Sequence, residues 1–385
     1  MWTVLAIIFW VDIALLTLTY AGYPAALVLR VRFCPRVPGG SGGETSPLTF
    51  VISLHDEVIV IAEKLRNSLA LEGTPRLVLA DDGSTDGSEE FCRVAAAAHP
   101  ERVCHVVVPR GGKNRTLNCA LEEISRGIIV FSDANAMYER DAVLRLGEAF
   151  SDPAVGCVVG QLRYHKGGET LEGAYWRYEN RVKQAESDAG SMVVGNGTII
   201  AARRSLVPTL LPGVANDLQI PLAVARAGYR TVFRPDAVAR EHMSDTHGEE
   251  YARKVRMATR GLSHAGEMFS LAPGVLKLQF LVHKVMRWLT GVALLEVLLL
   301  SVALALGRGG VWHWLLGIQI AGYALAGVGA AGERRGIRVP GTRFAHYFTV
   351  MHLAGLHATW RVLRGETVDV WEKPASTRRP AGGSG

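Results

Sequence analysis

Residues 77–88 read LVLADDGSTDGS, and this stretch decides the predicted fold. An apolar run that ends in two carboxylates and then breaks into Gly, Ser and Thr predicts a buried strand whose carboxyl end presents Asp81 and Asp82 on a loop. Asp86 is suited to cap the helix that follows, with Glu89 completing a capping-box-like pattern. The same string is compatible with an ordinary strand–turn–helix connection. The neighbouring motifs therefore have to decide between a ligand-binding loop and a plain turn.

Short strands rich in Val and Ile alternate with helix-like stretches around this motif. The expected strands are LTFVISL (48–54), RLVLAD (76–81), RVCHVVV (102–108), GIIVFSD (127–133) and VGCVVG (155–160), and helices are expected to begin near Glu57, Asp86, Lys113 and Arg140. This alternation predicts an α/β domain with a mostly parallel sheet and helices on both faces. Ligands of such sheets bind just after the strand ends. The polar motifs found there are HDE (55–57), DDGS (81–84), GGKN (111–114) and SDAN (132–135).

Apolar residues are concentrated at the two ends of the 385-residue chain. The stretches 2–29 and 288–331 are nearly free of charge, and about 20 apolar residues suffice to cross a bilayer, so at least three spans are expected. The first stretch lacks the flanks of a signal peptide and is predicted to be a retained anchor. Basic residues at 30, 32 and 36 place its carboxyl end in the cytoplasm.

The expected organisation follows from these spans. We predict an anchor (1–30), a Pro- and Gly-rich linker (31–47), a cytoplasmic α/β domain (48–247), interfacial helices (248–287), a transmembrane hairpin (288–331), and an interfacial or re-entrant helix with a cytoplasmic tail (332–385). The five cysteines lack metal-ligand spacing and are expected to be reduced. The net charge of +6 lies mainly beside apolar segments, which favours membrane lipids over nucleic acid as the partner.

A series of ordered segments resembles family-2 inverting glycosyltransferases with the GT-A fold, of the membrane-integrated kind related to cellulose, chitin and hyaluronan synthases. The segments are HDEVIVIAEKLRNSL, LVLADDGSTDGS, RGGKNRTLNCAL, IIVFSDANAMYERDAV, YWRYENRVKQAES, VGNGTIIAARRSL, ANDLQIPLAVARAGYRTVFRPDAVARE and ARKVRMATRGL, within residues 48–262. The resemblance implies transfer of a sugar from a nucleotide-sugar, with a UDP-sugar as the expected donor, to a glycan or glycolipid acceptor at the cytoplasmic face, for polysaccharide synthesis.

The resemblance also assigns the donor and metal residues. Asp133 and Asn135 match the family's DxD metal motif with an amide in place of the second acid, and oxygen ligands suit Mn²⁺ or Mg²⁺. The alternative is a plain turn. Asp82, with Asp81 beside it, resembles the acid that contacts the base and ribose of the nucleotide. Lys113 either offsets phosphate charge or holds a structural ion pair.

An inverting transfer requires one general base, because the acceptor hydroxyl attacks in a single displacement. Asp217 in ANDLQIPL matches the last Asp of the family's ED or DD motif, although Asn216 replaces the acid before it. The alternative is that Asp217 only caps the helix expected at 218–227. Glu57 matches the Glu of the family's NE pair and is a further donor-binding candidate, or else a first-turn helix acid.

RKVRM stands where related synthases carry QxxRW. Arg253 and Arg256 are three residues apart and share a helix face, so both can point at a diphosphate. A basic stripe against lipid headgroups is the alternative. Met257 replaces the Trp, and a sugar stacks less well on a thioether than on an indole, so the acceptor is expected to differ from a growing glucan. Trp176 and Asn196 are the other acceptor-binding candidates, whereas the apolar stripe within 171–185 is expected to be core.

Two other functions remain open at the level of sequence. The replacement of Trp by Met257 is compatible with a lipid acceptor such as a polyprenyl phosphate or a ceramide-like alcohol. Asn135 and Asn216 stand where acids are expected, which is compatible with a nucleotide-binding membrane protein without turnover. With three or four spans, an export channel would require an oligomer or a partner chain.

Overall fold

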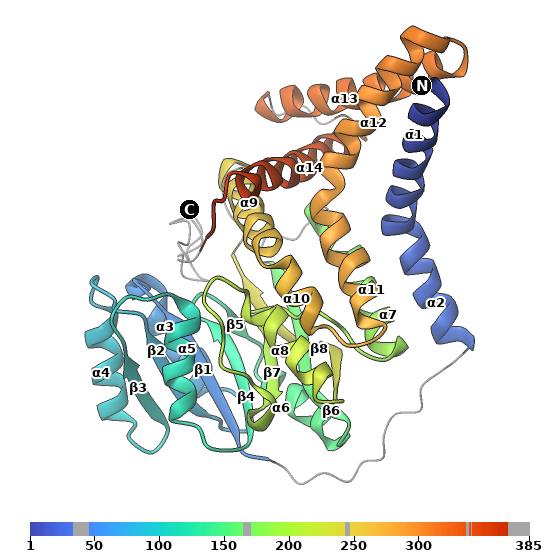
Figure 1. The fold of residues 1–385 in the computed structure, drawn as a ribbon. Coiled ribbons are helices and arrows are strands. Elements are labelled where there is room, and N and C mark those ends of the chain that lie inside the picture. Colours follow the sequence, from blue (N-terminus) through green and yellow to red (C-terminus); the bar gives the residue numbers. More distant parts are fainter. Residues whose placement is uncertain (34–45, 165–170, 243–246, 336–338, 340, 369–385) are drawn as a thin grey trace.

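The computed structural model describes residues 1–33, 46–164, 171–242, 247–335, 339 and 341–368 (Figure 1). The expected linker falls largely on 34–45 and the basic tail on 369–385, both outside the described residues. An α/β domain forms one end of the molecule and apolar helices project from it. Its sheet has eight strands in the order β3-β2-β1-β4-β7-β6-β8-β5. The strands are β1 Leu48–Leu54, β2 Arg76–Asp81, β3 Val103–Val107, β4 Ile128–Asp133, β5 Met137–Tyr138, β6 Val155–Tyr164, β7 Ile200–Arg203 and β8 Arg230–Glu241.

The first half of the sheet is parallel, as the alternating pattern predicted. Leu54 of β1 lies opposite Asp81 of β2, and Ser53 lies opposite Asp133 of β4. The carboxyl ends of these strands, and the loops that follow them, therefore share one edge. The second half is mixed, because β7 runs antiparallel to both β4 and β6, and β5 runs antiparallel to β8. Strand β8 was not among the expected strands.

Helices cover both faces of the sheet because successive strand residues point to opposite sides. Phe50 and Ile52 face the core under α3 (Val58–Leu69), α4 (Ser88–Ala98) and α6 (Ala142–Glu148). Val51 faces the opposite core, under α5 (Lys113–Glu122) and α8 (Asn216–Arg226). The predicted α/β arrangement with helices on both faces is confirmed.

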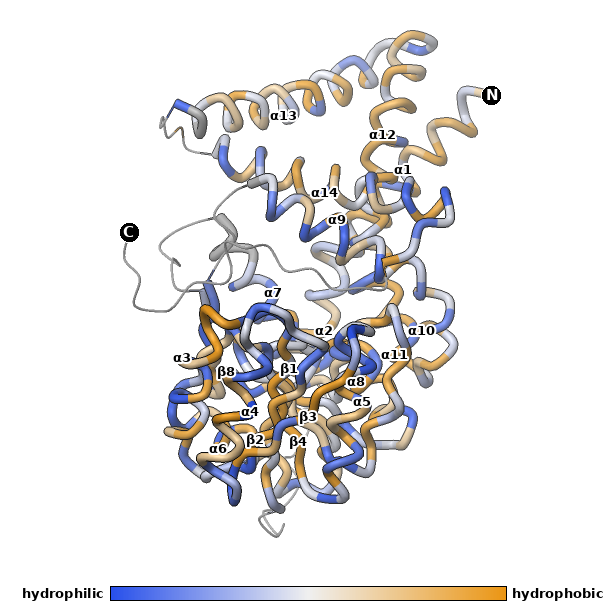
Figure 2. Tube along the Cα trace, turned by 90° about the vertical axis from the view of Figure 1, so that its left-hand side faces the viewer, coloured by the Kyte–Doolittle hydropathy of each residue, from blue (hydrophilic) through white to orange (hydrophobic). Residues whose placement is uncertain are grey.

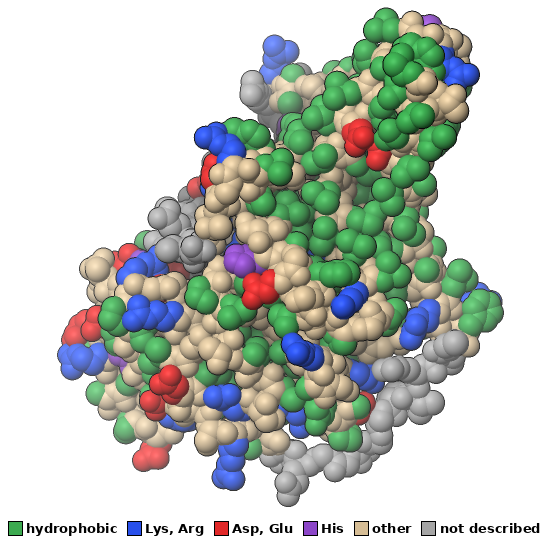
Figure 3. Space-filling model, in the orientation of Figure 1, with side chains coloured by type: hydrophobic (Ala, Val, Ile, Leu, Met, Phe, Trp, Pro, Cys, Tyr) green, Lys and Arg blue, Asp and Glu red, His purple; other side chains and the backbone are tan. Residues whose placement is uncertain are grey.

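Three helices in the described part of the chain are long and apolar enough to cross a membrane: Trp2–Phe33, Leu276–Arg308 and Val311–Gly332. The first comprises α1 (Trp2–Thr17) and α2 (Tyr23–Phe33); the second comprises α11 (Leu276–Phe280) and α12 (Met286–Arg308); and the third lies in α13 (Val311–Arg334). Figure 2 shows their apolar character along the trace, and Figure 3 shows hydrophobic side chains over this part of the surface. The second helix includes much of the stretch expected to lie at the interface.

The apolar helices are tied to the α/β domain through α7 (Leu171–Ala189), α9 (His247–Ser263) and α10 (Ala265–Leu271). Leu218 and Leu222 of α8 share a core with Met268 and Phe280. Helix α14 (Thr342–Leu363) crosses α12 closely, since a methyl group added at Gly291 would lie 2.0 Å from the His352 carbonyl oxygen. These contacts place α7, α9, α12 and α14 around one space above the sheet edge.

Candidate functional site

The Asp82 carboxylate organises the loop before α5. Its oxygens accept hydrogen bonds from the backbone N–H groups of Gly111 (2.8 Å) and Gly112 (3.0 Å) and from the hydroxyl of Thr116 (3.0 Å). Arg110 adds a charged contact at 2.5 Å. Asp82 is 3% exposed, so its carboxylate is committed to holding the loop that leads to α5.

The neighbouring acids of the opening motif join the first two strand-end loops. Asp81 accepts hydrogen bonds from the backbone and hydroxyl of Ser84 (2.9 and 2.6 Å), and burial raises the pKa of Asp81 despite those bonds. Asp86 accepts from the N–H of Val58 (3.0 Å) at the start of α3 as well as from Ser88 in α4. Glu57 is buried, and its own N–H donates to the Ser88 hydroxyl at 2.8 Å. Asp86 thus accepts from the first N–H group of both helices, although the N-cap of α4 is Gly87 and not the predicted Asp86.

A cavity of about 720 Å³ lies between the sheet edge and helices α7, α9, α12 and α14. Of the predicted site residues it is lined by Lys113, Asp133, Trp176, Asn196, Asp217, Arg253, Arg256 and Met257. Glu57, Asp81, Asp82 and Asn135 are not among its lining residues. The structure therefore brings the predicted base, phosphate-binding and acceptor residues together around one cavity. The carboxylates of Asp81 and Asp82 do not line that cavity.

The turn after β4 carries the candidate metal residues. Lys113 Nζ lies 2.6 Å from Asp133 Oδ1, and the Asn135 amide donates to Glu241 Oε1 at 2.5 Å. Glu241 ends β8 and lines the cavity. Within the described residues no three His, Cys, Asp or Glu side chains form a metal cluster. Asp133, Asn135 and Glu241 nevertheless offer the oxygen donors that Mg²⁺ and Mn²⁺ prefer.

A buried lysine holds this turn in shape. Lys64 is fully buried, and its ammonium donates to the Ser132 hydroxyl at 2.8 Å and to the Ala136 carbonyl oxygen. It also lies over the rings of Phe50 and Tyr138 at 4.9 and 4.7 Å. Its bonds to both sides of the Asp133–Asn135 segment fix the backbone on which the metal candidates sit.

Asp217 lies in the first turn of α8, beside the loop of Gly195, Asn196 and Gly197. Its Oδ2 accepts the Gly197 N–H at 3.2 Å, and its carbonyl oxygen accepts the Gly195 N–H at 2.6 Å. The N-cap of α8 is Ala215, with no side-chain capping bond, so the carboxylate does not cap its own helix. A methyl group at Gly197 would lie 3.7 Å from Lys113 Nζ and 3.8 Å from Asp217 Cβ. The candidate base and the Lys113–Asp133 pair are therefore neighbours.

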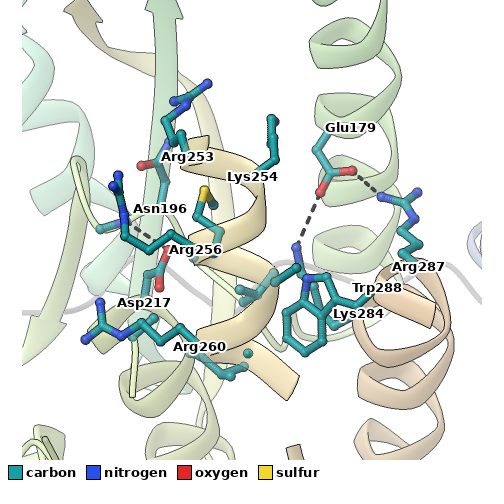
Figure 4. A pocket seen from close by; sticks show the side chains of 18 of the residues that line it. Glu179, Asn196, Asp217, Arg253, Lys254, Arg256, Arg260, Lys284, Arg287 and Trp288 are labelled. Atoms are coloured by element: carbon teal, nitrogen blue, oxygen red, sulfur yellow. Dashed lines mark hydrogen bonds and ion pairs between the residues drawn. The ribbon is translucent and has the colours of Figure 1, made fainter. Parts of the chain in front are cut away.

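Helix α9 contributes a row of arginines to the cavity. Figure 4 shows Arg256 and Arg260 projecting from α9 on the side where Asp217 and Asn196 lie, whereas Arg253 extends away from Asp217. Arg253 pairs with Glu250 at 2.7 Å, and Arg260 donates to the carbonyl oxygen of Gly213 at 2.6 Å. Met257 lies in the same turns and is 52% exposed. Arg253, Arg256 and Arg260 all line the cavity, so the two arginines predicted to act on a diphosphate border the same space.

The opposite side of the cavity contains a buried charge cluster that sequence reasoning missed. Glu179 of α7 pairs with Arg287 at 2.5 Å, with His283 at 3.1 Å and with Lys284 at 3.7 Å. Burial alone would raise the pKa of Glu179, but the charges of Arg287, His283 and Lys284 hold that pKa well below its usual range. The only sequence signal was a row of charges on α7 at 179, 183 and 186, which resembles a solvated helix face.

The parallel sheet edge, bordered by the arginine-bearing helix α9 and joined to apolar helices, is the arrangement expected of a GT-A-type domain. Residues 49–211 match the Glycosyl transferase family 2 profile. Residues 49–211 therefore carry a family 2 glycosyltransferase domain. The predicted family resemblance is confirmed.

The relatives found among curated proteins are bacterial. An N-acetylglucosaminyltransferase of Rhizobium leguminosarum bv. viciae is 26% identical over 239 residues, 56% of this chain and 56% of the relative. A second, from Rhizobium sp. (strain N33), is 23% identical over 284 residues, 68% of this chain and 63% of the relative. The chain thus spans about half to two thirds of their length.

A solved structure shares nearly the whole architecture. A mannosyltransferase from Pyrobaculum calidifontis, solved in complex with GDP-Man and Mn²⁺, superposes with a TM-score of 0.70 at 23% identity. The alignment covers 93% of this chain and 99% of that one, so the likeness includes the apolar helices as well as the sheet. The predicted GT-A-type fold is confirmed.

Proposed function

We propose that the protein is a membrane-bound inverting glycosyltransferase that moves a sugar from a nucleotide-sugar to a glycan or glycolipid acceptor. The observation that carries this proposal is the shared cavity, in which Asp217, the Lys113–Asp133 pair and the arginines of α9 lie together. A base, a phosphate-binding set and an acceptor space are the parts that a single displacement requires. A binding protein without turnover would not require a carboxylate beside the phosphate-binding groups.

The reaction uses these residues in one step. The acceptor hydroxyl oxygen attacks the anomeric carbon of the donor sugar, and its proton passes to the Asp217 carboxylate. The bond from that carbon to the diphosphate oxygen breaks, and the nucleoside diphosphate leaves with the electron pair. Arg253 and Arg256 offset the negative charge that grows on the diphosphate. A divalent cation held by Asp133, Asn135 and Glu241 would supply further positive charge to the leaving group.

The donor and the metal are inferred from relatives together with the site. The curated relatives are N-acetylglucosaminyltransferases, which makes UDP-N-acetylglucosamine the first donor to test. The superposed mannosyltransferase was solved with GDP-Man and Mn²⁺, so GDP-mannose belongs in the same panel and Mn²⁺ is the first metal. Asp133 and Glu241 provide the oxygen ligands for it.

The side of the membrane follows from charge. Arg30 and Arg32 lie in the last turn of α2, at the end of the first apolar helix that leads towards the α/β domain. Basic residues flanking a span favour the cytoplasmic side. We therefore place the glycosyltransferase domain in the cytoplasm, where nucleotide-sugars are made.

The experiment is a turnover assay with the purified full chain. The protein is incubated with Mn²⁺ and UDP-glucose, UDP-N-acetylglucosamine, UDP-glucuronate or GDP-mannose, and released nucleoside diphosphate is measured in the presence of bacterial membrane extract. Release with one donor, abolished by EDTA and restored by Mn²⁺, supports the proposal. Nucleotide binding without release from any donor contradicts it and favours a non-catalytic role.

Product analysis decides between the two acceptor classes. A ladder of water-soluble oligosaccharides indicates chain extension, whereas a single organic-extractable product indicates transfer to a lipid. Aromatic and apolar side chains of α12 and α14, among them Trp288, Phe344 and Phe348, line the cavity and favour the lipid product.

A further inference from the structure

Lys183 is a buried lysine in the cavity that forms no ion pair within the described part of the chain. It lies on α7, is 4% exposed and lines the cavity. Its ammonium lies 5.7 Å from the centre of the Trp176 ring. Among the described residues it makes no hydrogen bond and no ion pair. Buried ammonium groups are normally paired, so this one indicates a missing anion.

The nearby carboxylates are already engaged by other groups. Glu179 is held by Arg287, His283 and Lys284, and Glu186 accepts hydrogen bonds from Tyr23 at 2.6 Å and lies 2.5 Å from His283. Burial lowers the pKa of Lys183, although Glu179 opposes that shift. Lys183 of α7, Lys284 of the turn at Leu281–Val285 and Arg287 of α12 thus lie around Glu179 and Glu186, which are engaged by groups other than Lys183.

Lys183 lies between the candidate donor-binding residues and the charge cluster at Glu179, since its ammonium and that of Lys254 of α9 lie over the same Trp176 ring at 5.7 and 5.8 Å. Arg256 extends towards Asn196 and Asp217 on one side of α9, whereas Lys284 and Arg287 lie on the other side of that helix (Figure 4). Figure 4 shows Trp288 near Lys284, and α14 lines the cavity with Phe344, Phe348 and Met351 as well as with Tyr347 and His352. The cavity therefore has a charged part and an adjoining apolar part, which together suit an amphiphile with an anionic head.

We propose that Lys183, assisted by Lys284, binds the phosphate of a phosphorylated lipid acceptor, whose hydrocarbon chain lies against Trp288, Phe344 and Phe348. The proposal rests on the proposed function and specifies its acceptor class. Asp217 lies close enough for its charge to act on Lys183, so a sugar hydroxyl carried by a lipid-linked phosphate would be presented to the base. The phosphate serves as an anchor and takes no part in bond making.

Binding is measured without turnover, so that failure of the glycosyltransferase proposal does not affect the result. The full chain in detergent is titrated with farnesyl phosphate, with farnesol and with inorganic phosphate, by microscale thermophoresis. We expect farnesyl phosphate to bind at least about tenfold more tightly than farnesol or phosphate, because each lacks one of the two contacts. Lys183→Met should lower the affinity for farnesyl phosphate about tenfold to hundredfold, and Lys183→Arg should retain most of that affinity.

Matched controls identify the source of any loss. Arg181→Met removes a cation from the exposed face of the same helix and should change nothing. The melting temperature of each variant verifies folding. Equal binding of farnesol and farnesyl phosphate, or equal affinity of Lys183→Met and wild type, would overturn the anionic anchor. If inorganic phosphate bound as tightly as farnesyl phosphate, the proposed contact with the hydrocarbon chain would be wrong. If Lys183→Met lost affinity for UDP and kept its affinity for farnesyl phosphate, the lysine would belong to the donor site. Farnesyl phosphate binding without donor turnover would sink the proposed function alone.

Discussion

Replacing the base candidate by its amide gives the sharpest test of the site. In Asp217→Asn the side chain keeps its shape and can still accept the Gly197 N–H, which contacts Asp217 Oδ2 at 3.2 Å. The cost in folding stability should therefore stay within about 1 kcal/mol. Proton removal from the acceptor is lost, and general-base catalysis contributes about 10²–10⁴ in rate, or roughly 3–5 kcal/mol of barrier. We expect kcat to fall by that factor while the donor still binds.

The assay separates chemistry from binding. Nucleoside diphosphate release gives kcat, nucleotide titration gives donor affinity, and the melting temperature reports folding. Asp188→Asn is the matched control, because Asp188 lies exposed on α7 and accepts a hydrogen bond only from Gln184 at 2.8 Å among the described residues. Its kinetics should equal those of the wild type. Full turnover in Asp217→Asn would refute the base assignment, and loss of donor binding would show that the carboxylate acts on the donor.

Further predictions concern the residues that support the site. Asp82→Asn should raise the donor Michaelis constant before it lowers kcat, since it loosens the loop before α5; steady-state kinetics check this, and an unchanged Michaelis constant with lower kcat contradicts it. Lys64→Met should leave the turn at Asp133 less ordered and lower the free energy of unfolding by about 1–3 kcal/mol. It should also reduce the rise in melting temperature on addition of Mn²⁺, and an unreduced rise would contradict this role of Lys64. Glu179→Gln should lower the free energy of unfolding by about 3–5 kcal/mol, because it leaves the neighbouring cations without their counter-charge. The low pKa of Glu179 stabilises the fold above about pH 4.5, and that contribution is lost as pH falls through the folded-state pKa, so thermal denaturation across acidic pH should be steeper in wild type than in the variant.

The parallel half of the sheet could be predicted because each of its strands is a short local signal. An apolar run followed by a polar break occurs at Leu54, Asp81 and Asp133, and the topology brings these ends to one edge. Strand β8 carries no such signal, since Arg234, Pro235 and Asp236 interrupt it. Its pairing with β6 shifts register at that point, and the interruption is tolerated because the strand bulges there.

The charge cluster behind the cavity could not be predicted for a different reason. Glu179 and Arg287 are 108 residues apart and belong to helices that the sequence describes only as amphipathic or apolar. On α7 alone, Glu179 and Lys183 are spaced like a solvated pair. Their burial depends on how α12 packs against α7, which is a tertiary fact. Asp217, Arg253 and Arg256, which line the same cavity, could be named from the sequence because each belongs to a recognisable motif.

The positions of Asp82 and Asp217 predict that the two carboxylates control different kinetic parameters. Asp82 binds the backbone of Gly111 and Gly112, and the next residue, Lys113, reaches the Asp133 carboxylate at 2.6 Å. Asp82 is absent from the cavity lining, so any effect on the donor passes through the position of Lys113. Asp217 lies in the cavity itself. Substitution of Asp82 should therefore be partly compensated by high donor concentration, whereas no donor concentration should compensate the loss of the Asp217 carboxylate.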